Sequence, residues 1–303
     1  MTSIRTARDG RWGETFARLK AMVREGRYEE VEAEARALAA LPGRPWRRRP
    51  PHWEARVLAT GTAVMHGRVA EALDELDTLI ADLEPVGLNS RMLLLIARSS
   101  RVAALSGLRR YAEAETEANG ILRELNQIAH RAPVSALEIN TLGHLSAVLC
   151  GLDRHEEAEA VARGNLTRAN GSAVAVQHTT LARALNGQGR HEEALAEVRQ
   201  DGVPQPPRYA AGYLDLVTAE ALNGLGRREE AATSARRALA GCERELHPDH
   251  PRIPEARDLL ARVTGENTGE KGGRGSEHRR AGTRGGVCRP FGEPPSRVPR
   301  RPS

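Results

Sequence analysis

The chain has 303 residues, enough for two globular domains or one long repeat array. Aromatic residues make up only 3% of it, a composition that suits many small helix–helix contacts and argues against a β-sandwich or an aromatic-rich core. The net charge is +5, and residues 265–303, with nine Lys or Arg against four Glu, account for all of it, so the remaining body is neutral and offers no support for a nucleic-acid partner.

The N-terminal stretch from Met1 to Lys20 lacks the apolar run of a signal peptide. The longest apolar run, Met92 to Ala97, is far shorter than a membrane span. Cys150, Cys242 and Cys288 are odd in number and widely spaced, so they predict neither a disulfide framework nor a zinc site. We expect a cytoplasmic protein with no membrane partner.

A six-residue phrase recurs six times along the chain. Each copy contains a turn-forming residue, an Arg, two variable positions, a Glu and a closing Ala or Val. Successive copies stand 36 to 44 residues apart. The copies are 26–31 (GRYEEV), 67–72 (GRVAEA), 109–114 (RRYAEA), 153–158 (DRHEEA), 189–194 (GRHEEA) and 226–231 (GRREEA). Such periodicity indicates a repeat architecture.

The phrase predicts the end of one helix and the start of the next. Its leading Gly suits the residue just past a helix end, where a left-handed backbone costs little without a Cβ. The Glu residues then fall in the first turn of the following helix, where negative charge meets the positive end of the dipole. The closing Ala, or Val31, is expected where two helices cross closely.

The residues before each phrase predict how the two helices pack. Nine positions before the closing residue stand mostly large apolar side chains: Met22, Ala63, Leu105, Leu149, Leu185 and Leu222. Twelve positions before it stand mostly small ones: Leu19, Thr60, Val102, Ser146, Ala182 and Ala219. Residues three apart share a helix face, so each unit offers a knob beside a slot for an antiparallel partner helix. The second helix carries its own apolar set, such as Leu73, Leu76, Leu79, Ile80 and Leu83.

Helix breakers predict the linkers and the domain boundary. Pro42-Gly43 to Pro50-Pro51 is expected to join the first two units, and Pro204 to Arg208 the fifth and sixth. Residues 252–263 read as a capping helix. Residues 1–264 therefore form one helical repeat domain, and the Gly- and Pro-rich residues 265–303 a disordered tail.

Together, the small residue, the apolar residue after it, the turn and the Glu-Ala pair resemble the tetratricopeptide repeat over about Glu14 to Val263. The spacing and the end of the last unit, 243–251 (ERELHPDHP), are similar to the kinesin-light-chain-like subclass, in an actinobacterial type. The resemblance implies an all-α superhelix of about six helix-turn-helix repeats with a capping helix. Arg109 and Asp153 replace the turn Gly, which predicts irregular joints there, and the fifth unit breaks early at Asp201-Gly202.

No motif in the chain predicts catalysis or a cofactor. The glycine-rich segments 186–189 and 223–226 lack the Gly-Lys-Ser/Thr of a phosphate-binding loop and occupy the repeat's own turn. The Glu residues recur once per unit, which marks them as helix-start residues rather than an acid/base pair. We therefore predict that the chain is not an enzyme and needs no cofactor.

Histidines and basic stretches are the remaining candidate binding sites. His247 and His250 flank Asp249, but two histidines without a third ligand do not predict a metal site. His155 and His191 stand where other copies have Tyr and are expected to be packing residues. Residues 44–49 (RPWRRR) and 297–301 could contact nucleic acid through charge, although a solvated loop and tail account for them as well.

The predicted function is a protein–protein interaction scaffold that binds a peptide or protein surface in the concave groove of the solenoid. The alternative is a regulatory module that senses a ligand and acts with a separate transcription or signalling partner. The groove is expected on the exposed face of the first helices, where amides can pair with the backbone of an extended peptide. The candidate residues are Asn140, Thr179, Arg183, Asn186, Tyr213, Glu220 and Asn223. A pairing of Arg183 with Glu220, with the Asn residues capping turns, is the structural alternative.

Overall fold

The computed structural model describes residues 2–42, 50–86, 90–129, 135–171, 173–200 and 202–265, without the side chains of 2–11 and 86. The chain divides into one unit of residues 1–267 and another of 268–303. Residues 266–303 of the predicted disordered tail, with Cys288 and the basic stretch 297–301, lie outside the described residues, as does the basic stretch 44–49. Over the described ranges the chain forms thirteen α-helices and two short 3-10 helices, and no strand.

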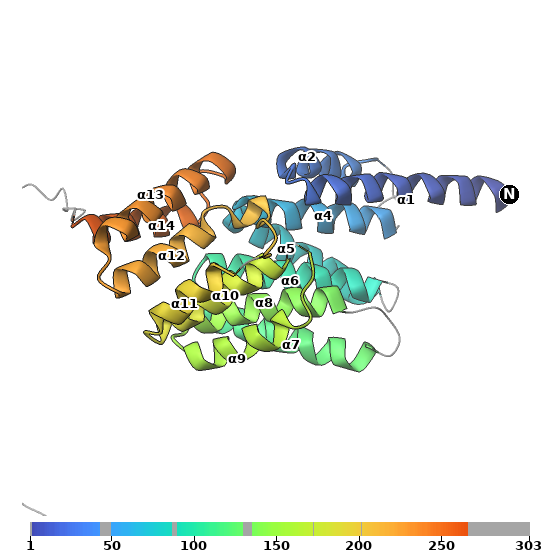
Figure 1. Cartoon of the computed structure of the whole chain (residues 1–303). Coiled ribbons are helices and arrows are strands. Elements are labelled where there is room, and N and C mark those ends of the chain that lie inside the picture. Colours follow the sequence, from blue (N-terminus) through green and yellow to red (C-terminus); the bar gives the residue numbers. More distant parts are fainter. Residues whose placement is uncertain are drawn as a thin grey trace, which may run out of the picture. The chain divides into compact units, whose positions relative to one another are not determined.

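Twelve of the helices form six antiparallel units. The first helices are α1 (Thr2–Arg24), α4 (Pro50–His66), α6 (Arg91–Gly107), α8 (Ser135–Gly151), α10 (Ala173–Gly187) and α12 (Tyr213–Gly224). The second helices are α2 (Tyr28–Ala39), α5 (Val69–Leu83), α7 (Tyr111–Ile128), α9 (His155–Leu166), α11 (His191–Val198) and α13 (Arg228–Glu245). From α4 onward each first helix contacts the next one, so these helices form a continuous layer (Figure 1).

Each recurring phrase forms the turn between the two helices of a unit, as predicted. Gly26, Gly67, Gly189 and Gly226 take positive φ angles between 74° and 109°. In all six turns the N–H of the phrase's Arg donates to the carbonyl of the residue five positions earlier, at 2.9–3.0 Å, which closes the helix end in a Schellman geometry.

The third and fourth turns are regular as well. Arg109 and Asp153 both adopt φ 58°, the left-handed conformation of the glycines they replace. The prediction of irregular joints at these two positions is therefore wrong. The backbone hydrogen bonds of the turn hold a conformation that side chains adopt only at a cost.

The Arg of the phrase has a local partner that the sequence analysis missed. In five turns it forms an ion pair of 2.5–2.7 Å with the Glu three residues later, and in the second turn the pair is 3.5 Å long. Hydrogen bonding to the guanidinium lowers the pKa of Glu30, Glu113, Glu157, Glu193 and Glu230. These pairs lie at the surface and contribute little to stability.

The predicted knobs and slots form the core. All six closing residues, Val31 and the five Ala, are fully buried, and the twelve knob and slot residues are each less than 5% exposed. One apolar cluster runs through the second, third and fourth units, and another through the fifth, the sixth and α14. The register predicted from the sequence is confirmed.

Histidine and tyrosine rings pack between successive units. The rings of Tyr111, His155 and His191 lie on Gly151, Gly187 and Gly224, which end the next first helix. A Cβ at any of these glycines would come within 2.5 Å of the ring. The predicted packing role of His155 and His191 is confirmed.

Two segment boundaries differ from or refine the prediction. Pro50 and Pro51 begin α4 rather than belonging to the linker, since proline is well tolerated in the first helical turn. The fifth unit does break early, because α11 has only eight residues. Residues 203–207 have no regular secondary structure and lead to a 3-10 helix, η3 (Arg208–Ala210). A second 3-10 helix, η1 (Glu84–Val86), follows α5. Helix α14 (Arg252–Thr264) covers α13 with Ile253, Ala256, Leu259 and Val263, as a capping helix should.

Candidate functional site

The seven residues predicted to line the groove lie on the first helices α8, α10 and α12. Asn140 on α8 and Asn223 on α12 are exposed. Arg183, Asn186 and Glu220 are partly buried, whereas Thr179 and Tyr213 are buried. The Oγ1 of Thr179 donates to the carbonyl of Ala175 within its own helix. Of the seven residues, only Asn140 and Asn223 are therefore exposed at the surface, and the other five are partly or fully buried.

Arg183 is at the centre of a polar cluster. Its Nη2 lies 2.5 Å from Oε1 of Glu255, in the first turn of α14, and its guanidinium carbon is 5.8 Å from the centre of the Tyr213 ring. Although burial favours the neutral form, the nearby Glu255 and Glu220 carboxylates hold the pKa of Arg183 well above its usual value. The hydrogen-bonded partner of Arg183 is therefore Glu255, and not Glu220 as in the structural alternative.

Glu220 faces the same cluster from α12. Burial raises the pKa of its carboxyl group, while Arg183 acts in the opposite direction. The structure thus brings Arg183, Tyr213 and Glu220 together. They cluster beside α14, which the sequence predicted only as a capping helix.

The two equivalent asparagines differ in their contacts. Asn186 donates from Nδ2 to the carbonyl of Val217 at 2.9 Å, and its Oδ1 lies 3.1 Å from Nδ1 of His191. Asn186 therefore joins the fifth unit to the sixth through its Nδ2, whereas its Oδ1 contacts the second helix of its own unit. Asn223 stands at the same position of the sixth unit and is exposed.

Arg252 also belongs to this cluster and was not predicted from the sequence. Its Nη1 donates to the carbonyls of Tyr209 and Ala211 at 3.0 and 3.1 Å, and its guanidinium lies 5.0 Å from the centre of the Tyr213 ring. Burial lowers the pKa of Arg252. Arg252 and Glu255 lie outside the six phrases, so no periodic signal pointed to them.

Two surface grooves open beside the second helices of the first and fifth units. One lies among α2, α4 and α5, and the other among α11, α12 and α13. Helices α2 and α11 have 12 and 8 residues, against 18 in α7 and α13. Helix α9 also has 12 residues, so the length of the second helix does not by itself account for the two grooves.

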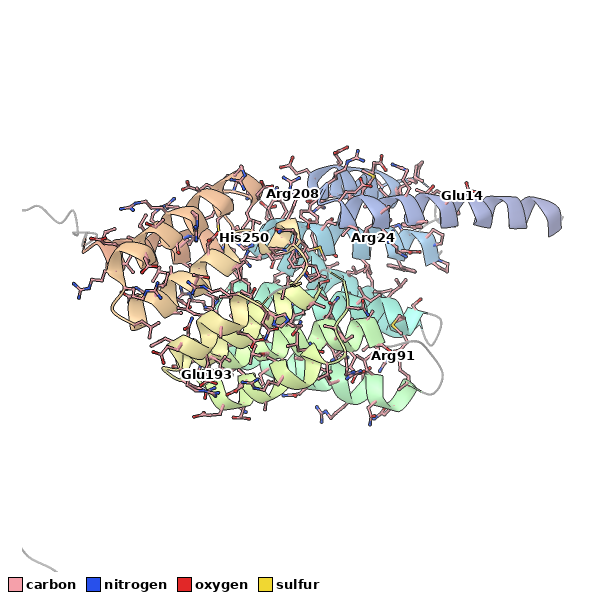
Figure 2. The ribbon with its side chains drawn as sticks, in the orientation of Figure 1. Glu14, Arg24, Arg91, Glu193, Arg208 and His250 are labelled. Carbon is pink, nitrogen blue, oxygen red and sulfur yellow. The ribbon has the colours of Figure 1, made fainter. Side chains whose placement is uncertain are left out.

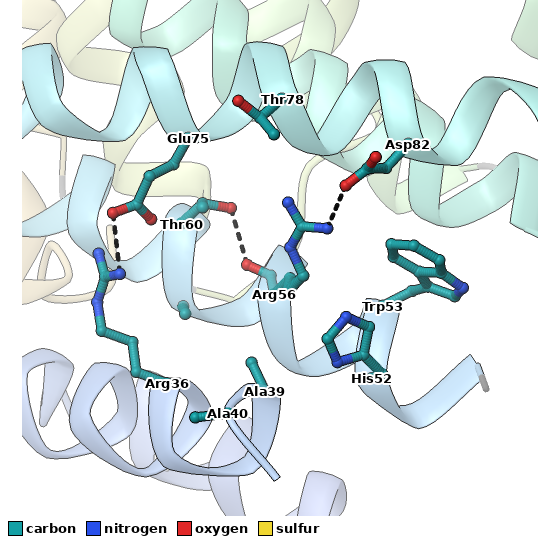
Figure 3. A pocket seen from close by; sticks show the side chains of 11 residues that line it. Arg36, Ala39, Ala40, His52, Trp53, Arg56, Thr60, Glu75, Thr78 and Asp82 are labelled. Atoms are coloured by element: carbon teal, nitrogen blue, oxygen red, sulfur yellow. Dashed lines mark hydrogen bonds and ion pairs between the residues drawn. The ribbon is translucent and has the colours of Figure 1, made fainter. Parts of the chain in front are cut away.

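The groove beside α2 is lined by basic side chains, by acidic side chains and by the Trp53 ring. Figure 3 shows Arg36 reaching Glu75 and Arg56 reaching Asp82, at 2.9 and 2.6 Å. The Arg56 guanidinium lies 5.6 Å from the centre of the Trp53 ring. With two cations and two anions in pairs, the groove has no net charge that would select an acidic or a basic partner.

The described residues contain neither a cluster of metal ligands nor a membrane-spanning helix. Within them no three His, Cys, Asp or Glu side chains are arranged to hold a metal ion. In the same ranges no helix is both long and apolar enough to cross a bilayer. His247 and His250, the histidines considered for metal, lie instead against the end of α4.

Comparison with known proteins supports the assignment of the repeat. A family model described as tetratricopeptide repeat matches residues 219–252, from the middle of α12 through α13 to the start of α14. Among solved structures, a tetratricopeptide repeat protein from Parabacteroides merdae ATCC 43184 is similar at 14% identity, with a TM-score of 0.43 over 84% of this chain and 98% of that chain. No curated protein matches the sequence. In its described residues the chain is all-α, a stack of antiparallel helix pairs, and the tetratricopeptide-repeat match lies in the last of these pairs.

Proposed function

We propose that this chain is a non-catalytic scaffold that binds an extended segment of another protein along its layer of first helices. The observation that carries the proposal is the continuous stack of first helices from α4 to α12, because such a stack offers a partner one long surface. Tetratricopeptide repeats generally mediate protein–protein interaction, and the sixth unit matches that family. The kinesin-light-chain-like, actinobacterial subclass and the cytoplasmic location belong to the same proposal.

The partner is proposed to lie across α8, α10 and α12. Asn140 and Asn223 are exposed there, and an amide can donate to and accept from a peptide backbone of any sequence. Arg183 and Glu220 add one charge of each sign beside them. Asn186, Thr179 and Tyr213 support the surface from beneath, since their polar groups or rings already make contacts inside the protein.

A peptide selected by display against the full chain provides the test. Its affinity is measured by fluorescence anisotropy for the wild type and for the Asn140→Ala, Asn223→Ala double variant. Loss of two backbone-directed amides should weaken binding about tenfold or more, with an unchanged helical signal, because hydrogen bonds each contribute about 0.5–1.5 kcal/mol.

Thr78→Arg is the matched control. Thr78 is exposed in the groove beside α2, and a long side chain there would fill that groove. If Thr78→Arg abolishes binding and the double variant binds as the wild type does, the proposed surface is wrong and the groove is the binding site. Asn186→Ala is unsuitable, because it would also break the contact between the fifth and sixth units.

A further inference from the structure

The segment between α13 and α14 packs against the first units of the chain. The N–H of His247 donates to the carbonyl of His66 at 3.0 Å, and the two imidazole centres are 5.3 Å apart. His66 ends α4, so its carbonyl is one of those that a helix leaves without an internal partner. A residue from the other end of the repeat domain therefore closes this helix.

Three residues of the C-terminal half cover three N-terminal turns. The ring of His250 lies on Gly67, where a Cβ would come within 2.6 Å of it, and Pro251 lies near Gly107. Arg208 lies on Gly26 and donates from Nη1 to its carbonyl at 3.2 Å. Figure 2 shows Arg208 and His250 where the C-terminal elements meet the N-terminal ones.

Hydrogen bonds inside segment 247–252, which hold the shape that docks on α4, use imidazole nitrogens as acceptors. Nδ1 of His250 accepts the N–H of Arg252 at 3.0 Å, and Nδ1 of His247 accepts the N–H of Asp249 at 3.3 Å. A neutral ring that accepts at Nδ1 carries its proton on Nε2. A second proton must bind Nδ1, where it would turn the acceptor into a donor that faces another donor.

The charges around the cluster oppose protonation of its buried ring. Burial, and then Arg252, His66 and His247, lower the pKa of His250 to about 3. Burial also lowers the pKa of His66, with His247 and Arg208 acting in the same direction and Glu29 against them.

The acidic neighbours of the cluster do not reverse the lowering of these pKa values. Glu29 lies 3.5 Å from Nε2 of His66, and Asp249 lies 3.6 Å from Nδ1 of His247. Their side chains are 80% and 85% exposed, so water screens both carboxylates. His250 is 8% exposed. The charged or titratable groups that influence the pKa of its ring are one cation, Arg252, and two imidazoles, those of His66 and His247.

We propose that the contact of residues 247–252 with the end of α4 is a proton-sensitive latch, closed while the His250 and His66 imidazoles are neutral and opened when they take up protons. The direction follows from linkage. When the latch is open, the His250 imidazole titrates near its ordinary pKa of 6.5. When the latch is closed, the pKa of this imidazole is lowered. Closure is therefore fully favoured above pH 6.5 and weakens as the pH falls below it. The latch does not depend on the proposed partner.

Hydrogen exchange of the full chain, read by mass spectrometry at pH 7.5 and 5.5 after correction for intrinsic rates, tests the latch. Protection of the peptides covering 64–68 and 246–252 should fall about tenfold at pH 5.5, the linkage expected for one such histidine. Peptides covering 187–191 and 224–228, turns that the latch does not touch, should keep their protection. Equal loss in all four peptides would mean global unfolding and would overturn the proposal.

His250→Asn removes the titrating group and keeps an acceptor, because Asn Oδ1 can take the place of Nδ1. This variant should stay protected at pH 5.5, while His191→Asn, with its ring on a distant turn, should respond to pH as the wild type does. Should His250→Asn prove unlatched already at pH 7.5, His66→Asn removes the other imidazole whose pKa burial lowers and supplies the same comparison. Wild-type protection that is unchanged at pH 5.5, or a pH response retained in the Asn variant that latches, would refute the proposal.

Discussion

The turns of the first two units and those of the last two are built from the same phrase but lie in different surroundings. Gly26 and Gly67 are covered by Arg208 and His250, which come from the far end of the repeat domain. Gly189 and Gly226 take the same left-handed conformation, and a Cβ on either would meet nothing within 4 Å. The local sequence therefore specifies the turn, whereas the position of the unit in the array decides whether the turn is also a contact surface.

Alanine at the covered turn should have the largest effect. Gly67→Ala places a Cβ 2.6 Å from the His250 ring, at a φ of 109° that side chains rarely adopt. The combined strain and displacement should cost about 3 kcal/mol of unfolding free energy. Urea denaturation followed by circular dichroism measures it.

Gly226→Ala is the matched control at an open turn. It adds only the backbone cost of a left-handed residue, about 1 kcal/mol. An equal loss of unfolding free energy in the two variants would show that the contact of His250 with Gly67 does not contribute to stability.

Removal of the Arg208 side chain should have an intermediate effect. Arg208→Ala loses the bond to the Gly26 carbonyl and the 2.7 Å pair with Glu245, for about 1 kcal/mol, since half of the side chain is exposed. Exchange protection of residues 24–28 should fall with it. Arg227→Ala, which breaks only a surface pair with Glu230, should change neither stability nor exchange measurably. A comparable loss in both variants would argue against the contact.

The smallest expected effect is a gain. Arg109 occupies the left-handed position of the third turn without a glycine. Arg109→Gly should stabilise the chain by about 0.5 kcal/mol, because relief of the steric cost outweighs the added flexibility of the unfolded state. A thermal melt compares the variant with the wild type, and a lower melting temperature would contradict the expectation. Asp153→Gly should gain less, since Asp tolerates this conformation better.

The fold was predictable because its signals are local and repeated. The spacing of the closing residues from the knobs and slots fixed which helix faces meet, and burial of Ala182 and Ala219 agrees with it. Helix α4 shows the limit of such signals. Pro50 and Pro51 resembled a linker, since a proline that starts a helix and one that ends it are alike in sequence.

The candidate surface was predictable only in part. Helical periodicity placed Arg183 and Asn186 on one face, but it could not show what else reaches that face. Glu255 of α14 binds Arg183, and the Val217 carbonyl binds Asn186. Both partners lie outside the unit that carries the predicted residue.

By itself the sequence determined the unit of this protein: two helices, a left-handed turn and a close crossing at a small residue. Each of these features depends on residues within about one repeat. Each therefore recurs in all six repeats and can be predicted from any one of them. Only the tertiary structure decided that His250 rests on Gly67 and Arg208 on Gly26. Those pairs depend on how far the stacked units rotate before their ends meet, a sum of small angles between units that no single repeat encodes.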